Sequence, residues 1–221
     1  MSQHFLREIE ALKQKLLGLS AMVEERIAKA IDSVVKNDPL LALEVVEGDN
    51  DVDQVEVDVE EDCLKLLALY HPVAVDLRFV VAVLKINNDL ERMADKAVNI
   101  ARRAEYLAQQ PRQTLPSSLT AMAREVELMV RHSLDALVQD DTTLARQVCA
   151  NDRAVDRYNR EIHKEIQTQI RSNPDDVERL VHTLSVARHL ERIGDLATNV
   201  AEDVIYTVEG EIVRHRTGAY A

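Results

Sequence analysis

Aromatic and turn-forming residues are scarce in this chain of 221 residues. It has no Trp, two Phe and five Tyr, together with five Gly and five Pro. A mostly β protein needs aromatic residues in its strands and Gly or Pro in its frequent turns, so this scarcity argues against one. The many Leu, Val, Ala, Glu, Asp and Arg residues instead favour long helices with aliphatic seams.

The chain also lacks long apolar runs and cysteine motifs. Its longest apolar stretches, such as 79–84 (FVVAVL), are far shorter than the ~20 residues that span a bilayer. Charged residues such as Arg7 and Glu8 interrupt the N-terminal segment, so we expect no signal peptide. Cys63 and Cys149 have no motif spacing, and we interpret them as buried apolar residues in a reducing compartment. These features predict a cytoplasmic protein.

Positively charged residues are fewer than negatively charged ones. The chain has 27 Lys and Arg against 39 Asp and Glu, a formal net charge of -12. The segment from Glu44 to Asp62 holds ten acidic residues and no Lys or Arg. Such a surface repels phosphate backbones, so we expect no nucleic-acid ligand. It attracts cations or a basic face of another protein.

One charged segment occurs twice, one hundred residues apart. Residues 84–101 (LKINNDLERMADKAVNIA) return as 184–201 (LSVARHLERIGDLATNVA), and eight of the eighteen positions are identical. The identical positions include the charged residues of an E-R-x-x-D sequence. Apolar periodicity recurs by chance far more readily than the same charged residues in the same order. We therefore interpret the chain as a tandem duplication.

Breaks in the apolar pattern divide the chain into long helical segments. The breaks fall at 37–39, 71–72, 110–118, 139–141 and 172–174. The segments between them, of about 25 to 35 residues, carry apolar residues at helical spacing. Asp38-Pro39 and Asn173-Pro174 are typical of an N-cap followed by a first-turn proline.

These breaks predict the fold class. We expect an all-α protein of two tandem antiparallel three-helix bundles, with six long helices in all. The loop at 109–118, with its two prolines, falls midway, so we place the domains at 1–110 and 111–221. The duplication predicts that the two bundles are related by a pseudo-twofold axis or a translation.

Acidic residues form rows at helical spacing in both halves. On one predicted helix of the first half, Glu91 and Asp95 lie one turn apart on a strip with Asn88, Asn99 and Arg102. The helix before it carries Asp49, Asp53, Glu56 and Glu60. The corresponding rows of the second half are Glu191, Asp195, Asn199 and Glu202, and Asp152, Asp156, Asn159 and His163. Across an antiparallel helix pair, the two rows of each half can face each other.

Facing acidic rows need compensating positive charge. Each exposed pair of like charges one turn apart costs ~0.2–0.5 kcal/mol. Carboxylates with neighbouring amides, and without thiolates or paired histidines, suit divalent or trivalent ions such as Mg²⁺, Mn²⁺ or iron rather than zinc. The candidate metal ligands are Asp49, Asp53, Glu56, Glu91, Asp95, Asp152, Asp156, Glu191 and Asp195, with Glu60, Asn99, Asn199 and Glu202 as secondary candidates. Because Asn159 and His163 replace two carboxylates, we expect the second site to be weaker or to prefer another metal.

Three alternatives to a metal-binding regulator stay open. The rows can be solvated faces, steadied by Arg92, Arg102 and Arg103. The chain can be a metal-free scaffold bundle. It can also be a carboxylate-bridged metal enzyme of the ferritin-like kind, although such sites use Glu-x-x-His and no histidine here has an acidic residue three positions before it. We predict no catalytic residue.

Three segments resemble the PhoU family of phosphate-uptake regulators. They are HPVAVDLR at 71–78, LERMADKAVNIA at 90–101 and LERIGDLATNVA at 190–201. The resemblance covers essentially the whole chain and implies two three-helix bundles with two metal clusters. It assigns Asp49, Asp53, Glu91 and Asp95 to the first cluster and Asp152, Asp156, Glu191 and Asp195 to the second. The second half departs from the pattern because it has no copy of HPVAVDLR.

The resemblance also implies a function. The chain is expected to be a non-enzymatic cytoplasmic protein that represses the phosphate-starvation response. Its implied partners are the ATPase of the phosphate ABC transporter and a sensor histidine kinase, through which it would reach the membrane. A homodimer is likewise expected from the family resemblance.

Overall fold

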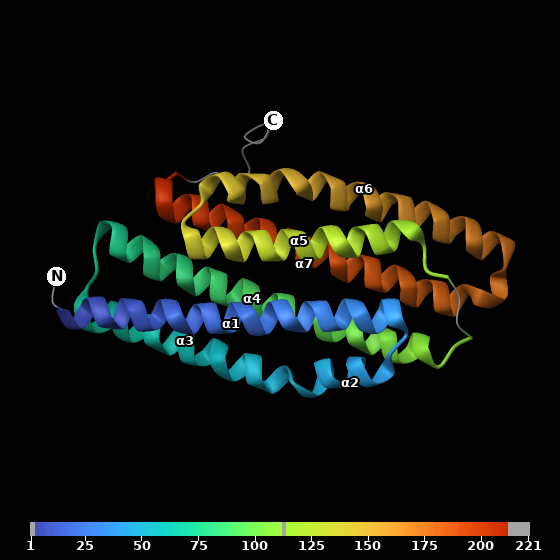
Figure 1. Cartoon of the computed structure of the whole chain (residues 1–221), viewed down its shortest axis with the longest axis horizontal. Helices are drawn as coiled ribbons and strands as arrows, with labels where there is room; N and C mark the ends of the chain where they lie inside the picture. The colour runs from blue at the N-terminus through green and yellow to red at the C-terminus, as the bar shows by residue number, and fades with distance from the viewer. Residues whose placement is uncertain (1–2, 112–113, 212–221) are drawn as a thin grey trace.

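The computed structural model describes residues 3–111 and 114–211, and its regular secondary structure is entirely helical (Figure 1). The elements in chain order are α1 (Gln3–Lys36), α2 (Pro39–Glu47), α3 (Asp49–Tyr70), α4 (Ala74–Ala108), α5 (Ser117–Gln139), α6 (Thr142–Ser172), the short 3-10 helix η1 (Pro174–Asp176) and α7 (Val177–Glu209). Within the described residues there is no strand. The predicted all-α class is confirmed.

The predicted cap at Asp38 is present. Its side chain accepts hydrogen bonds from the backbone N–H groups of Leu40 and Leu41 at 3.0 and 3.2 Å, with Pro39 as the first residue of α2. These bonds satisfy N–H groups that a helix start leaves without partners. Asn173 behaves differently from the prediction, because its side chain donates to Asp176 at 2.9 Å and does not cap a helix.

The predicted second helix is interrupted at Gly48, which separates α2 from α3. Arg26 on α1 donates to the carbonyl oxygen of Gly48, and its Nη1 lies 3.3 Å from Oδ1 of Asp49. A Cβ atom at position 48 would lie 2.7 Å from Nη2 of Arg26, too close for unshifted atoms. Glycine therefore allows the guanidinium to cover the break. Together α2 and α3 take the place of one long helix, so the six-helix plan holds with one interruption.

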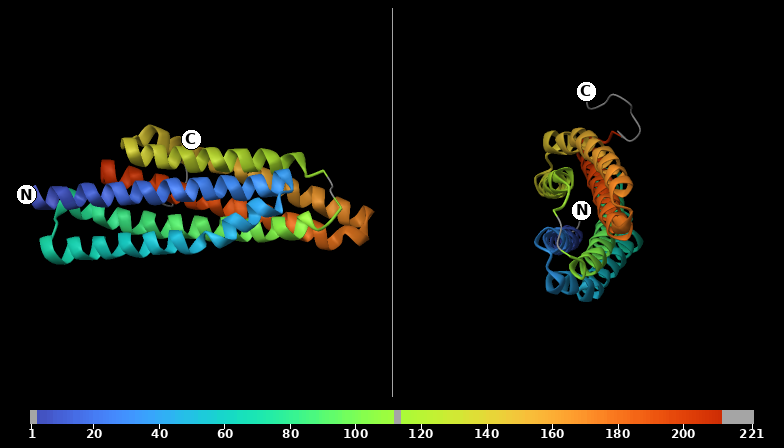
Figure 2. Two further views of the ribbon diagram at one scale, coloured as in Figure 1. Left: turned by 60° about the horizontal axis from the view of Figure 1, so that its bottom comes forward. Right: turned by 90° about the vertical axis from the view of Figure 1, so that its right-hand side faces the viewer.

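The two halves lie side by side with their long axes aligned. Helices α1 to α4 form one half and α5 to α7 the other (Figures 1 and 2). The main contact between them is α4 against α7, and α1 against α5 adds a smaller one. The helices are long: the 34 residues of α1 extend about 50 Å. None of the described helices is long and apolar enough to cross a membrane.

The duplicated segments lie in α4 and α7 and run in opposite directions. Nζ of Lys85, near the start of α4, lies 3.5 Å from Oδ1 of Asp203, near the end of α7. At the other end, the rings of Tyr106 and His182 stack with centroids 3.7 Å apart. A translation would have left the copies parallel, so their antiparallel contact indicates a local twofold axis between them.

The core is aliphatic and extends through both halves. Equivalent positions of the repeat are buried in each copy, as Leu90 and Leu190 show, and the same cluster includes residues of α1 and α5. Burying one such leucine contributes about 1.5–3 kcal/mol. Cys63 and Cys149 are both buried, as predicted. Burial raises the pKa of the Cys63 thiol to about 12.

Candidate metal centre

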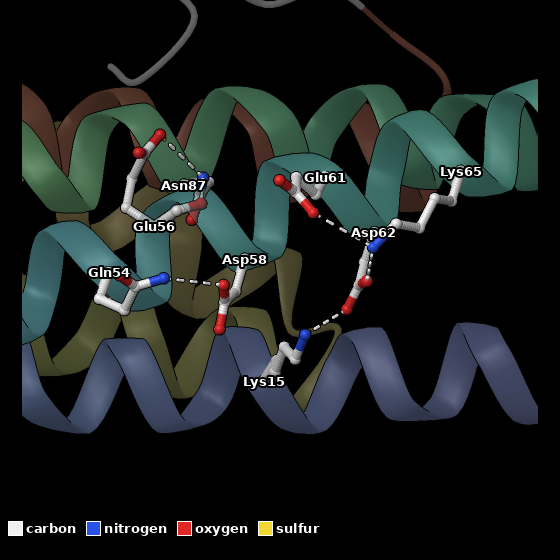
Figure 3. A network of polar contacts seen from close by, with 8 residues as sticks. All are labelled: Lys15, Gln54, Glu56, Asp58, Glu61, Asp62, Lys65 and Asn87. Atoms are coloured by element: carbon white, nitrogen blue, oxygen red, sulfur yellow. Dashed lines mark hydrogen bonds and ion pairs between the residues drawn. The ribbon is translucent and has the colours of Figure 1, made fainter.

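The first pair of acidic rows is brought together by α3 and α4. Asn87, a buried residue of α4, donates from Nδ2 to Glu56 on α3, at 2.9 Å to the backbone oxygen and 3.1 Å to Oε1 (Figure 3). This amide joins the two helices in the middle of the rows. Its own Oδ1 is buried and has no hydrogen-bond partner among the described residues.

The carboxylates of these rows affect one another across the helix pair. Burial raises the pKa of Glu91, and the charge of Asp95 on its own helix and those of Glu56 and Asp53 on α3 raise it further. Burial likewise raises the pKa of Asp49, and Asp53 and Asp95 add to the effect although Arg26 opposes it. The five primary candidates of the first half therefore share one patch.

The donor chemistry of this patch fits a hard cation. Carboxylate oxygens and one unsatisfied amide oxygen are the ligands that Mg²⁺, Mn²⁺, Ca²⁺ and iron accept. As the described side chains lie, no group of three or more acidic, histidine or cysteine residues is arranged to hold a metal ion. Asp53 and Asp95 are exposed, so rotation of their side chains would be needed to close such a centre.

The secondary candidates of the first half have separate surroundings. Glu60 is exposed. Burial is the main cause that raises the pKa of Glu56, and the charge of Glu60 raises it further. The Asn99 amide donates to the backbone oxygen of Asp95 at 2.7 Å, so it bonds along its own helix. Asn88, which the sequence placed on the acidic strip, is exposed, and Asn87 takes the inward position. Stepping back four residues from Glu91 finds Asn87, whereas stepping back three finds Asn88.

The second pair of rows faces across α6 and α7. Burial raises the pKa of Asp195 to about 6, with further contributions from Asp152 and Glu191 that Arg192 opposes. Burial also raises the pKa of Asp152, and Asp156, Glu191 and Glu202 add to it. All four primary candidates of the second half thus lie together, with Glu202 beside them. Of the other row residues, Asn199 on α7 and His163 on α6 are partly buried.

The two patches differ in which helix carries the central amide. In the second half, Nδ2 of Asn159 on α6 donates to Oε1 of Glu191 on α7 at 2.8 Å. In the first half the amide of Asn87 belongs to α4 and the carboxylate of Glu56 to α3. Oδ1 of Asn159 is also buried and without a partner among the described residues. The exchange removes one carboxylate from the middle of the second patch.

Other acidic residues of α3 are paired away from the first patch (Figure 3). Asp62 contacts Lys15 on α1, and Nζ of Lys65 lies 3.4 Å from Asp62 and 3.3 Å from Glu61. Burial alone would raise the pKa of Asp62, but hydrogen bonds and charge from Lys15 and Lys65 outweigh burial and lower it. Gln54 donates to Asp58 at 3.1 Å. The acidic run therefore divides into a compensated face and a face that meets α4.

A family model matches the chain in two places. The PhoU domain aligns with residues 16–104 and again with residues 119–204. Each match contains one pair of acidic rows. The two matched segments together cover more than half of the chain.

Known proteins are similar over nearly the whole length. A phosphate-specific transport system accessory protein PhoU homolog of Aquifex aeolicus is 41% identical over 210 residues, covering 95% of each chain. The crystal structure of PhoU from Pseudomonas aeruginosa has a TM-score of 0.91 and 34% identity, covering 94% of this chain and 100% of that one. The phosphate transport system regulatory protein PhoU from Streptococcus pneumoniae has a TM-score of 0.87 and 29% identity, covering 95% and 99%.

Proposed function

The chain belongs to the PhoU family, and we propose that it is a non-enzymatic regulator of phosphate uptake that acts by protein–protein contact. The support is the similarity over nearly the whole chain to proteins named as accessory or regulatory parts of phosphate transport systems. It represses the phosphate-starvation response when phosphate is plentiful.

The partners in this proposal are the ATPase of the phosphate ABC transporter and a sensor histidine kinase. The chain works in the cytoplasm, as a homodimer, and reaches the membrane through these partners. Its long helices lie along a common axis and offer an extended surface, and the net charge of -12 favours a basic partner face. The family relationship carries this part of the proposal.

Metal binding by the acidic patches is the second part of the proposal. Asp49, Asp53, Glu56, Glu91 and Asp95 hold an ion between α3 and α4, and Asp152, Asp156, Glu191 and Asp195 hold one more weakly between α6 and α7. A bound cation supplies the positive charge that facing carboxylates lack, so it ties the two helices of each pair together. The effect of Asp95, Glu56 and Asp53 on the pKa of Glu91 is the observation behind this assignment.

A thermal melt tests the metal assignment. Metal-free protein in EDTA is compared with protein in Mn²⁺, Mg²⁺ or Fe²⁺, and elemental analysis counts the ions. At one hundred times the dissociation constant, binding stabilises the fold by about 2.7 kcal/mol, which corresponds to a rise of about 5–10 °C in a protein of this size. We expect Glu91→Gln with Asp95→Asn to abolish the first-site share of this rise.

A charge-matched control separates ligation from general charge. Asp58→Asn with Glu61→Gln removes the same charge from the compensated face of α3, and should leave the metal response intact. A response that both double variants lose equally, or that neither loses, would remove the assignment of the first patch.

Binding assays test the regulatory role directly. The purified chain is titrated into the transporter ATPase and into the cytoplasmic part of the kinase, with and without phosphate-replete conditions. Saturable binding to at least one of them is expected. If neither binds, and deletion of the gene leaves phosphate uptake and the starvation response unchanged, the regulatory role is wrong.

A further inference from the structure

The contact between α4 and α7 has two ends that are related by the local twofold axis but differ in charge. At a spacing of one hundred residues, Lys85 corresponds to Ser185 and Asp203 to Arg103. One end therefore carries an ion pair, and the equivalent place at the other end carries a serine and an arginine. The two ends therefore differ in the charge that would balance their side chains.

The first end is balanced by its own side chains. Nζ of Lys85 lies 3.5 Å from the buried carboxylate of Asp203 and 5.4 Å from the centroid of the Tyr206 ring. One turn along α4 from Lys85 is the buried Asp89, whose Oδ1 lies 3.1 Å from Nη1 of Arg92. Each buried acid here has a basic neighbour.

At the second end, His189 stands where the first end has Asp89. Oγ of Ser185 lies 3.5 Å from its Nε2. The charged groups that act on this imidazole are Arg103, Lys96 and Arg188, all of them cations. Nζ of Lys96 lies 3.9 Å from Oδ2 of Asp95, so Asp95 already neutralises part of the Lys96 charge.

Two nitrogen atoms at this end are buried and have no hydrogen-bond partner among the described residues, Nε of Arg103 and Nδ1 of His182. A polar atom left buried without a partner costs about 1–3 kcal/mol. Glu178, an acidic residue at this end, hydrogen-bonds with the hydroxyl of Tyr106, whose ring stacks on His182; burial and Arg103 lower the pKa of His182 although the charge of Glu178 opposes them. His182, Ser185 and His189 are spaced i, i+3 and i+7, so they share one face of α7.

We propose that Arg103, His182, Ser185 and His189 form a binding site for a small tetrahedral oxyanion of the phosphate and sulfate class. An arginine guanidinium binds such an ion through two parallel N–H donors, and the hydroxyl and the imidazole nitrogens provide further donors. The ion supplies the negative charge that Asp203 and Asp89 supply at the opposite end. This site depends on the charges at the α4–α7 contact and not on the partners or metal assigned above.

The test uses the full chain freed of metal with EDTA, so that phosphate cannot bind through an ion on the acidic patches. Inorganic phosphate, sulfate and chloride are titrated at constant ionic strength, while ¹⁵N NMR follows the histidine rings and calorimetry follows heat. We expect phosphate or sulfate to shift the His182 and His189 resonances saturably and chloride to leave them unchanged. Arg103→Gln should weaken binding by about tenfold or more.

Matched variants define what would overturn the site. Arg131→Gln removes the same charge from an exposed arginine that pairs with Glu24 on α1, and should keep normal affinity. If Arg103→Gln misfolds, Arg103→Lys and His189→Gln test the site in its place, and circular dichroism verifies that they fold. Both variants should bind phosphate or sulfate more weakly than the unmodified chain. Equal shifts from chloride, unchanged affinity in the Arg103 and His189 variants, or an equal loss in Arg131→Gln would each refute the proposal.

Discussion

Asn87 on α4 donates two hydrogen bonds to Glu56 on α3, one to the Glu56 backbone oxygen at 2.9 Å and one to the Glu56 carboxylate at 3.1 Å. The contact fixes the register of two helices whose facing side chains are mostly acidic. A neutral donor in this place holds the helices together without adding charge. Whatever binds the first patch meets rows that are already aligned.

Replacing Asn87 should therefore destabilise the first half. Asn87→Ala removes the donor and leaves a small buried gap, and we expect a loss of about 1–3 kcal/mol in the free energy of unfolding by urea. The neighbouring exposed residue gives the control, since Asn88→Ala should change stability by less than about 0.5 kcal/mol. Similar losses in both variants would show that the amide contact has no special part.

The second patch should make metal-free protein more stable as the pH falls. The folded-state pKa of Asp195 is raised to about 6 from the ordinary value of 3.8. Protonation is therefore favoured by folding, so the stabilising effect is complete below about pH 4 and is lost as the pH rises through 6. Asp49, Glu56, Glu91 and Asp152 shift in the same direction.

Thermal melts in EDTA between pH 4 and 8 measure this effect. Asp195→Asn should flatten the dependence of Tm on pH and raise Tm at pH 7–8, whereas the exposed Glu161→Gln on the outside of α6 should leave the curve unchanged. Because the Asp195 side chain is 48% exposed, solvent screens part of the effect. An unchanged slope in Asp195→Asn would contradict the assignment.

Restoring the missing carboxylate should make the second patch more like the first. Asn159→Glu places an acid where Glu56 lies in the first half, and should lower Tm in EDTA because it adds repulsion. In Mn²⁺ or Mg²⁺ the same variant should gain more from metal than the unmodified chain does. A smaller metal-induced rise in Tm would show that Asn159 is not at a ligand position.

The ion pair between Lys85 and Asp203 should couple the two halves. Lys85→Met removes the ion pair of the buried Asp203 carboxylate with Lys85, and we expect a cost of about 1–3 kcal/mol, reduced from the fully buried case because Lys85 is partly exposed. The double variant Lys85→Met with Asp203→Leu should recover most of this loss. Additive losses measured by urea unfolding would mean that the two residues do not interact.

Periodicity and repetition were enough to predict the helices and their duplication. The apolar spacing is a local property of the chain, and Leu90 and Leu190, at equivalent positions of the repeat, are both buried. The same reasoning brought Glu91 and Asp95 to the helix face that meets the preceding acidic row. These predictions needed only the helical repeat and the order of the chain.

What the sequence missed depends on contacts between distant elements. At the break, the carbonyl oxygen of Gly48 accepts a hydrogen bond from Arg26 of another helix, and the residues next to Gly48 in the sequence do not predict this contact. The sequence placed Asn88 on the acidic strip but gave no sign of Asn87, whose inward contact with Glu56 depends on the packing of α4 against α3. Only the antiparallel packing of α4 and α7 places Arg103 and Asp203, which differ in charge, at equivalent positions of the two ends of their contact.

The antiparallel meeting of two copies of one segment has a consequence for divergence. In a pair of identical chains, every substitution appears on both sides of the symmetry axis, so an arginine on one side would oblige an arginine on the other. Covalent linkage of the copies removes that obligation. Arg103 and Asp203 occupy matching places with opposite charges, an arrangement open only to halves that are inherited together yet altered one at a time.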